Sequence, residues 1–179
     1  MSLRLFAALP VPDEIAERLV HLQKGVPGAK WSPRENFHIT LKFFGDMDEA
    51  TAEDLDAELA CARVQPFQLA LKGAGSFGKT DPHAIWIGVE SHPSLMLLAQ
   101  ACDRAARRAG LVAEKRRYTP HVTLAYLKRT EVERVLAFER RCALFSTPAF
   151  TVDRFCLYSS HPRENAPNLY RVEAEYPLG

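Results

Sequence analysis

The same four-residue pattern occurs twice in the chain. HITL spans residues 38–41 and HVTL spans residues 121–124, and in each a His and a Thr are separated by one apolar residue. Side chains alternate between the two faces of a β-strand, so the His and Thr of each motif point to one face and the apolar residues to the other. Each motif therefore predicts a strand with one polar face and one buried face.

The segments that follow the two motifs have the same order. The first motif lies in a predicted strand at residues 36–45, and the second in one at residues 121–128. A helix follows each, at residues 49–62 and 131–143, and two further strands come after each helix. Those strands are predicted at residues 67–75 and 84–90 in the first half, and at residues 150–160 and 169–177 in the second.

This repetition predicts the fold class, which is α+β. The remaining predicted elements are a strand at residues 4–11 and helices at residues 13–26 and 93–109. We expect two pseudo-symmetric lobes, each an antiparallel sheet with helices on the outside, facing each other across a central cleft. A pseudo-twofold relation between the lobes would bring the two motifs together, and residues 1–179 would form a single bilobal domain.

Two His and two Thr side chains in one cleft suit chemistry on a phosphate. The ordinary pKa of His is near 6.5, so His38 and His121 can divide the roles of proton donor and proton acceptor. The hydroxyls of Thr40 and Thr123 can hold the phosphate oxygens. One such His alone would be an ordinary sheet residue, but two in matched settings favour catalysis. We expect no metal, because a hydrolytic zinc site needs about three protein ligands and neither motif supplies them.

Charge and the remaining polar residues leave two interpretations open. A net charge of +1 argues against a protein that coats nucleic acid by charge alone. Basic residues nevertheless bracket the second motif, namely Lys115, Arg116, Arg117, Lys128 and Arg129. They are either solvated surface residues or a source of attraction for one or two phosphates. The other histidines are expected at surfaces or helix caps, at positions His21, His83, His92 and His161.

The cysteines and the hydropathy indicate where the protein works. Cys61, Cys102, Cys142 and Cys156 show no CxxC pairing and lie in predicted helices or strands, where a free Cys behaves as a small buried apolar residue. We expect reduced thiols in a cytoplasmic protein. No run approaches the roughly 20 apolar residues of a membrane span, and no signal peptide is evident, so we expect no membrane contact.

The chain resembles the two-histidine phosphoesterase superfamily. Within it, the similarity is to the RNA 2′,3′-cyclic phosphodiesterases of bacteria and archaea, formerly described as 2′-5′ RNA ligases. The resemblance covers nearly the whole chain, through RLFAALPVP, WSPRENFHITLKFFGD, GSFGKTDPHAIWIGV, YTPHVTLAYL, FCLYSS and LYRVEAEYPL. It implies a bilobal antiparallel fold with the paired HxTx motifs facing each other across a cleft, without a metal or nucleotide cofactor.

The resemblance also implies a role for each motif residue. His38 would be the general acid that protonates the departing 3′ oxygen, and His121 the general base that activates water. Thr40 and Thr123 would hold the phosphate. The substrates would be RNA ends or nucleotides that carry a 2′,3′-cyclic phosphate, opened to 2′-phosphates, with reversible 2′-5′ ligation as an accompanying activity. We expect the enzyme to be a monomer.

One position departs from the pattern of these relatives. They commonly have a basic residue two positions after the Leu of the second motif, where this chain has Tyr126. Lys42, Arg117 or Lys128 could supply the phosphate contact expected there, and Tyr126 itself could touch the substrate.

Two aromatic residues are candidates for holding a nucleobase. Phe77 lies in a Gly-flanked segment and could stack on a base. Trp86 is expected to pack in the core instead. Two alternatives to an RNA phosphodiesterase also stay open. One is a binding module that holds RNA ends or tRNA without turnover, and the other is a cyclic phosphodiesterase for small nucleotides. Two titratable groups favour an enzyme, since binding alone would not require them.

Overall fold

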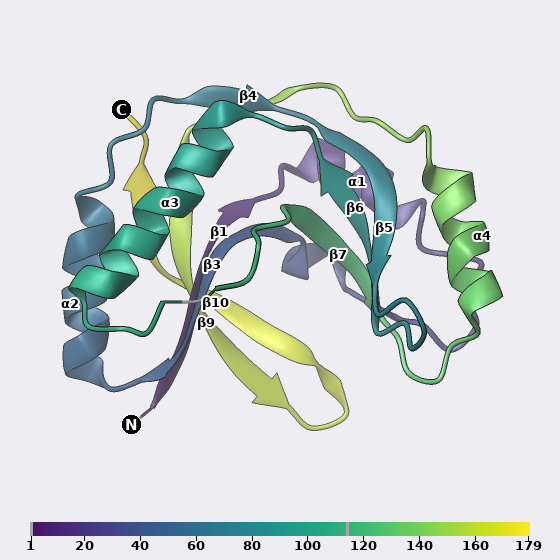
Figure 1. Ribbon diagram of the computed structural model, residues 1–179, viewed down its shortest axis with the longest axis horizontal. Coiled ribbons are helices and arrows are strands. Elements are labelled where there is room, and N and C mark those ends of the chain that lie inside the picture. Colours follow the sequence, from purple (N-terminus) through teal and green to yellow (C-terminus); the bar gives the residue numbers. More distant parts are fainter. Residues whose placement is uncertain (1, 114) are drawn as a thin grey trace.

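The computed structural model describes residues 2–113 and 115–179. The helices are α1 (Asp13–Val20), α2 (Glu49–Ala60), α3 (Pro93–Arg108) and α4 (Val132–Cys142). The strands are β1 (Leu3–Pro10), β2 (Lys30–Trp31), β3 (His38–Met47), β4 (Phe67–Leu69), β5 (Leu71–Phe77), β6 (Ala84–Val89), β7 (His121–Tyr126), β8 (Phe150–Val152), β9 (Arg154–Arg163) and β10 (Ala166–Pro177). Two four-stranded antiparallel sheets form the body of the molecule, with α2 and α3 outside one and α4 outside the other (Figure 1). The predicted α+β class with two facing sheets is confirmed.

Each sheet contains one motif strand and takes its neighbours from both halves of the chain. The β3 sheet has the order β10–β9–β1–β3, and the β7 sheet has the order β2–β7–β6–β5. Of the strands that follow the first motif, β6 pairs with the strand of the second motif and β5 pairs with β6. The two strands that follow the second motif, β9 and β10, belong to the sheet of the first. The chain crosses between the lobes, so neither half of the sequence makes a lobe by itself.

The apolar residues of the motifs fix which face of each strand meets solvent. Ile39 and Leu41 are 0% and 3% exposed, and Val122 and Leu124 are both 0% exposed. Burial of such a side chain stabilises a fold by about 1.5–3 kcal/mol relative to exposure. The strands therefore lie with these residues toward the helices, and the His and Thr side chains are left on the opposite face. On that face β3 and β7 approach each other.

Both motif strands carry a β-bulge at the same position. The register of β1 with β3 skips Leu41, and the register of β6 with β7 skips Leu124. An extra residue shifts the alternation of side chains by one position. The fifth residue after each motif His, which is Phe43 on β3 and Tyr126 on β7, consequently returns to the cleft face.

Several predicted elements differ from those observed. The first helix ends at Val20 rather than near residue 26, and Gly25 beyond it adopts a φ of 80°, which no right-handed helix can contain. The segment 67–75 divides into β4 and β5, the segment 150–160 divides into β8 and β9, and β4 pairs with β8 as a separate ribbon. The short strand β2, which pairs with β7, was not predicted.

The cysteines and helices can be compared with two further expectations. All four cysteines lie in the described part of the chain and are free thiols. Three are buried as predicted, whereas Cys61 is exposed because it caps the end of α2. None of the helices among the described residues has the length and apolar character needed to cross a membrane.

Candidate active site

Two cavities open beside the motif residues. The α3 cavity has a volume of about 690 Å³ and contains Thr40 of the first motif and His121 of the second. The hairpin cavity, bordered by the β9–β10 hairpin, has a volume of about 760 Å³ and contains His38 and Thr123. Each cavity thus takes its imidazole from one motif and its hydroxyl from the other, and the structure brings all four predicted residues to the cleft between the sheets.

The two imidazoles are held by the same local hydrogen bond. Nδ1 of His38 donates to the backbone carbonyl of Asn36 at 2.7 Å, and Nδ1 of His121 donates to the carbonyl of Thr119 at 2.6 Å. In both cases the acceptor lies two residues before the His. A carbonyl oxygen can only accept, so Nδ1 carries the proton in both rings. Nε2 of each ring is therefore the atom left for proton transfer.

Burial makes both histidines harder to protonate. Burial lowers the pKa of His38 to about 4, opposed by its hydrogen bond to Asn36 and reinforced by the charge of His121. Burial also lowers the pKa of His121, against the effect of its hydrogen bond to Thr119. Both imidazoles are therefore neutral at neutral pH. A negatively charged ligand would shift both pKa values upward, because it favours the charged imidazole.

Aromatic rings surround each imidazole. The ring of His38 lies 5.0 Å from that of Phe6 and 5.3 Å, edge to face, from that of Tyr170 between centroids. The ring of His121 lies 4.9 Å from Phe77, also edge to face, and 5.7 Å from Trp86. These contacts limit rotation of the imidazoles about χ2, and they supply the apolar surroundings that lower the pKa of both histidines.

Trp86 does not lie in the core as the sequence analysis expected. It is half-buried against His121 and Phe77, and its indole N–H is buried without a hydrogen-bond partner among the described residues. Gly75 pairs with Trp86 across β5 and β6, and a Cβ at position 75 would lie 2.3 Å from the indole ring. The glycine provides the space that the indole occupies, and this allows Trp86 to reach the cleft face beside His121.

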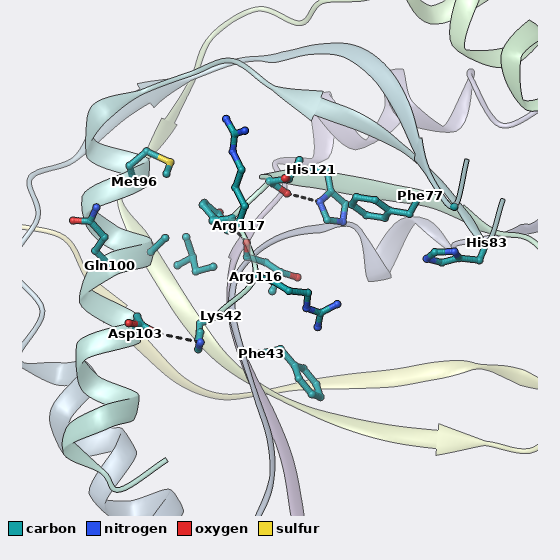
Figure 2. A pocket seen from close by; sticks show the side chains of 16 residues that line it. Lys42, Phe43, Phe77, His83, Met96, Gln100, Asp103, Arg116, Arg117 and His121 are labelled. Carbon is teal, nitrogen blue, oxygen red and sulfur yellow. Dashed lines mark hydrogen bonds and ion pairs between the residues drawn. The ribbon is translucent and has the colours of Figure 1, made fainter. Parts of the chain in front are cut away.

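Cationic side chains gather in the α3 cavity. Figure 2 shows Arg116 and Arg117 on the segment that crosses it, with α3 on one side and His121 on the other. Lys42 also lines it, but its side chain is only 11% exposed and its Nζ lies 3.1 Å from Oδ1 of Asp103. Of the three basic residues predicted to replace the one missing at position 126, Lys42 and Arg117 border this cavity. Lys128, although among the described residues, lines neither cavity.

Two tyrosines whose roles the sequence analysis missed connect the lobes. The hydroxyl of Tyr118 donates to the carbonyl of Thr40 at 2.9 Å, and burial raises the pKa of Tyr118, so it stays a donor. Tyr170 on β10 and Tyr126 on β7 line the same cavity, and burial together with the neighbouring Tyr126 raises the pKa of Tyr170 to about 12. No local sequence signal marks these tyrosines, because each contact joins residues that are distant along the chain.

The donor set gives the possible chemistry of the cleft. It offers two imidazoles, two Thr hydroxyls and nearby guanidinium groups, which together can transfer protons at an anionic, oxygen-rich ligand. Within the described residues, no group of three or more His, Cys, Asp or Glu side chains is placed to hold a metal ion.

A family model described as the 2′-5′ RNA ligase superfamily matches residues 11–164. The chain belongs to this superfamily. An RNA 2′,3′-cyclic phosphodiesterase of Archaeoglobus fulgidus is 33% identical over 135 residues, which cover 73% of this chain and 76% of the relative. One of Thermotoga maritima is 32% identical over 180 residues, covering 95% and 92%. The family membership implied by the paired motifs is confirmed.

Solved structures of superfamily members share the fold. The crystal structure of E. coli LigT complexed with 3′-AMP matches with a TM-score of 0.81 at 24% identity, covering 99% of each chain. The crystal structure of TT0787 of Thermus thermophilus matches with a TM-score of 0.80 at 23% identity, covering 98% of this chain and 97% of that one. At these identities the similarity shows the fold alone.

The lowered histidine pKa values predict how stability depends on pH. The unfolded chain binds a proton on His near pH 6.5, whereas folded His38 binds one only near pH 4. The unfolded state therefore binds more protons between these two pH values. The contribution of His38 to the free energy of unfolding is fully present above pH 6.5 and is lost as the pH falls toward 4. For His38 alone the slope approaches about 1.4 kcal/mol per pH unit. Urea unfolding at several pH values between 7.5 and 4.5 should show this loss of stability. The free energy of unfolding should fall less steeply with pH in His38→Gln than in the wild type. Equal slopes in the two proteins would contradict the prediction.

The packing of Trp86 on Gly75 predicts the effect of a single methyl group. In Gly75→Ala the new Cβ displaces the indole, which contacts His121 but not His38. The NMR signals of the His121 ring should therefore move because the aromatic ring current changes, while those of His38 stay in place as an internal control. Unmoved His121 signals in a folded variant would show that Trp86 does not position this imidazole.

Proposed function

We propose that the protein is an RNA 2′,3′-cyclic phosphodiesterase that opens terminal 2′,3′-cyclic phosphates to 2′-phosphates. The observation that best supports this function is the matched pair of imidazoles. Each has its Nδ1 bonded to the carbonyl two residues earlier, so each directs Nε2 to proton transfer in a cleft that also holds two Thr. The names of the relatives from Archaeoglobus and Thermotoga agree with this chemistry.

In this mechanism His38 acts as the acid and His121 as the base. Nε2 of His121 takes a proton from water as the water oxygen bonds to phosphorus. The bond from phosphorus to the 3′ oxygen breaks in line with the attack, and Nε2 of His38 gives its proton to that oxygen. The product carries a 2′-phosphate and a free 3′-hydroxyl. Thr40 and Thr123 donate to the non-bridging oxygens, where negative charge increases in the transition state.

This assignment requires the substrate to change the protonation of His38. Burial lowers its pKa to about 4, yet a proton donor must be charged before the bond breaks. The negative charge of the cyclic phosphate raises that pKa, so the proton enters together with the substrate. Binding and activation of the acid are thereby coupled, and the general acid is prepared only when an anion is present.

The cations of the α3 cavity complete the proposed site. We assign to Arg117 a phosphate contact from the side of the α3 cavity, because Lys42 is already engaged by Asp103 and Tyr126 lines the hairpin cavity instead. A guanidinium offers several donors to phosphate oxygens in a fixed geometry. Phe77 contributes by holding His121, and its edge contact with that ring competes with the base stacking predicted from the sequence.

The enzyme is proposed to act as a cytoplasmic monomer on RNA ends. A net charge of +1 fits recognition of one terminal phosphate rather than of a long backbone. If the 5′-hydroxyl of a second RNA occupied the place of water, the same proton transfers would produce a 2′-5′ linkage, and their reversal would cleave it. The alternatives are a binding module without turnover and an enzyme for small cyclic nucleotides.

Turnover of a defined substrate by histidine variants tests the function. The wild type should open an RNA oligomer ending in a 2′,3′-cyclic phosphate in the presence of EDTA, faster than it opens a mononucleotide 2′,3′-cyclic phosphate. His38→Ala and His121→Ala should each reduce turnover by about 10² or more, the usual effect of losing a positioned acid or base. His21→Ala, at the exposed end of α1, is the matched control. A folded His38 or His121 variant with near-normal turnover would refute the mechanism.

The identity of the product tests which histidine is the acid. The two ester bonds of the cyclic phosphate are chemically similar, so the one that breaks is the one whose oxygen lies against the protonated imidazole. With His38 beside the 3′ oxygen, phosphorus NMR of the opened product should show a 2′-phosphate. A 3′-phosphate would mean that the acid and base are exchanged or that the nucleotide binds in the opposite direction.

A further inference from the structure

The β9–β10 hairpin extends beyond the strand that pairs with it. β1 pairs with β9 from Cys156 to Ser159, and the hairpin continues past this pairing to its turn at Glu164 and Asn165. The two strands project from the body of the molecule as a ribbon (Figure 1). A two-stranded ribbon is only marginally stable by itself, so contacts between its tip and the rest of the protein matter for its position.

An irregularity near the tip leaves two carbonyl groups to side-chain donors. The register of β9 with β10 skips Pro167 and Asn168, where Pro has no N–H with which to continue the ladder. The carbonyl of Pro167 accepts from Nε of Arg163 at 2.8 Å. The carbonyl of Asn168 accepts from the side-chain amide of Asn36 at 2.9 Å. The second bond attaches the tip to the short 3₁₀ helix η1 (Arg34–Asn36), which leads into β3.

Asn36 therefore makes hydrogen bonds in two directions. Its side-chain amide donates to the hairpin, and its backbone carbonyl accepts from Nδ1 of His38 at 2.7 Å. Tyr170, two residues after Asn168, packs edge to face against the same imidazole. All four residues line the hairpin cavity. The hairpin thus holds His38 directly through the ring of Tyr170 and indirectly through the carbonyl of Asn36.

The segment before β7 is held by a different contact. The carbonyl that accepts from His121 belongs to Thr119. The neighbouring Tyr118 donates its hydroxyl to the carbonyl of Thr40 on β3, which is not part of the hairpin. The bond between Asn36 and the hairpin consequently acts on one histidine of the pair, the one to which the role of acid is assigned.

The first residue of η1 is held by charge. Arg34 forms ion pairs with Asp13 and Glu17 of α1, and all three side chains are exposed to solvent. Exposed ion pairs of this kind contribute little, because water and salt screen them. The amide of Asn36 is therefore the contact on which the position of the carbonyl beside His38 most depends.

We propose that Asn36 is a positioning residue for His38, through which the β9–β10 hairpin sets the orientation of the catalytic acid. The role of acid rests on the proposed function. With the amide bond in place, the carbonyl of Asn36 stays where Nδ1 of His38 can donate to it, and Nε2 is directed to the departing oxygen. Without the bond, the end of η1 is free to move, the ring loses its fixed acceptor, and its proton can shift from Nδ1 to Nε2.

The tautomer of His38 reports the effect of Asn36 directly. Long-range ¹H–¹⁵N NMR spectra, recorded at a pH where both rings are neutral, distinguish a proton on Nδ1 from one on Nε2. In the wild type both His38 and His121 should carry the proton on Nδ1. In Asn36→Ala a share of the Nε2–H tautomer should appear for His38, while His121 stays unchanged as an internal control. An unchanged His38 tautomer in folded Asn36→Ala would overturn the proposal.

Two further variants separate the amide bond from the general stability of η1. Arg34→Ala removes the ion pairs of the same turn but leaves the amide, so the His38 tautomer should remain that of the wild type. Asn36→Gln keeps an amide donor and should lie closer to the wild type than Asn36→Ala does. The proposal is wrong if Arg34→Ala changes the tautomer as much as Asn36→Ala, or if Asn36→Gln cannot be distinguished from Asn36→Ala.

Turnover of an RNA 2′,3′-cyclic phosphate relates the orientation of His38 to catalysis. Asn36→Ala should lower kcat about 10-fold and leave KM within about twofold, because a misdirected acid weakens the transition state more than it weakens substrate binding. A raised KM with an unchanged kcat would mean that Asn36 acts in binding, and would overturn its role as a positioning residue. If the wild type shows no turnover, the proposed function fails, and the tautomer spectra still decide whether Asn36 orients His38.

Discussion

The backbone carbonyl two residues before each motif His determines what the cleft can do. It accepts from Nδ1 at 2.7 Å for His38 and at 2.6 Å for His121, and so it fixes both the tautomer and the direction of each ring. A ring held in this way can exchange a proton only through Nε2. The carbonyl belongs to the segment that leads into each strand. The path of the backbone before β3 and before β7 therefore determines the orientation of both imidazoles.

The two histidines have the same local hydrogen bond, so any difference between their pKa values comes from the side chains around them. His38 lies among Phe6 and Tyr170, where burial lowers its pKa to about 4, and His121 lies beside Phe77 and Trp86, with its pKa lowered in the same direction. Two neutral imidazoles cannot act as an acid and a base until one is protonated. In the proposed mechanism, the negative charge of the ligand favours that step because it raises the pKa of a neighbouring imidazole.

The sequence predicts the motif strands, their buried and polar faces and the α+β class, because these depend on residues adjacent along the chain. It does not predict that β5 and β6 join the sheet of the second motif, since pairing between strands depends on packing partners distant in sequence. The same limit explains why the predicted position of Trp86 was wrong. Its apolar character suggested the core, but the missing side chain of Gly75 across the sheet opens a place for the indole beside His121. A strand pattern read alone contains no information about such a neighbour.

The exchange of strands between the lobes ties the two halves of the chain together around the cleft. Because β9 and β10 complete the β3 sheet while β5 and β6 complete the β7 sheet, the chain passes from one lobe to the other several times. The hydroxyl of Tyr118 donates to the carbonyl of Thr40 across the gap, and Tyr126 lies near Tyr170 on the other side of the motifs. Catalysis by paired imidazoles requires one Nε2 at the attacking water and the other at the departing oxygen, each placed to within a fraction of an ångström. The Tyr118 hydrogen bond therefore opposes a hinge motion that would separate the pair.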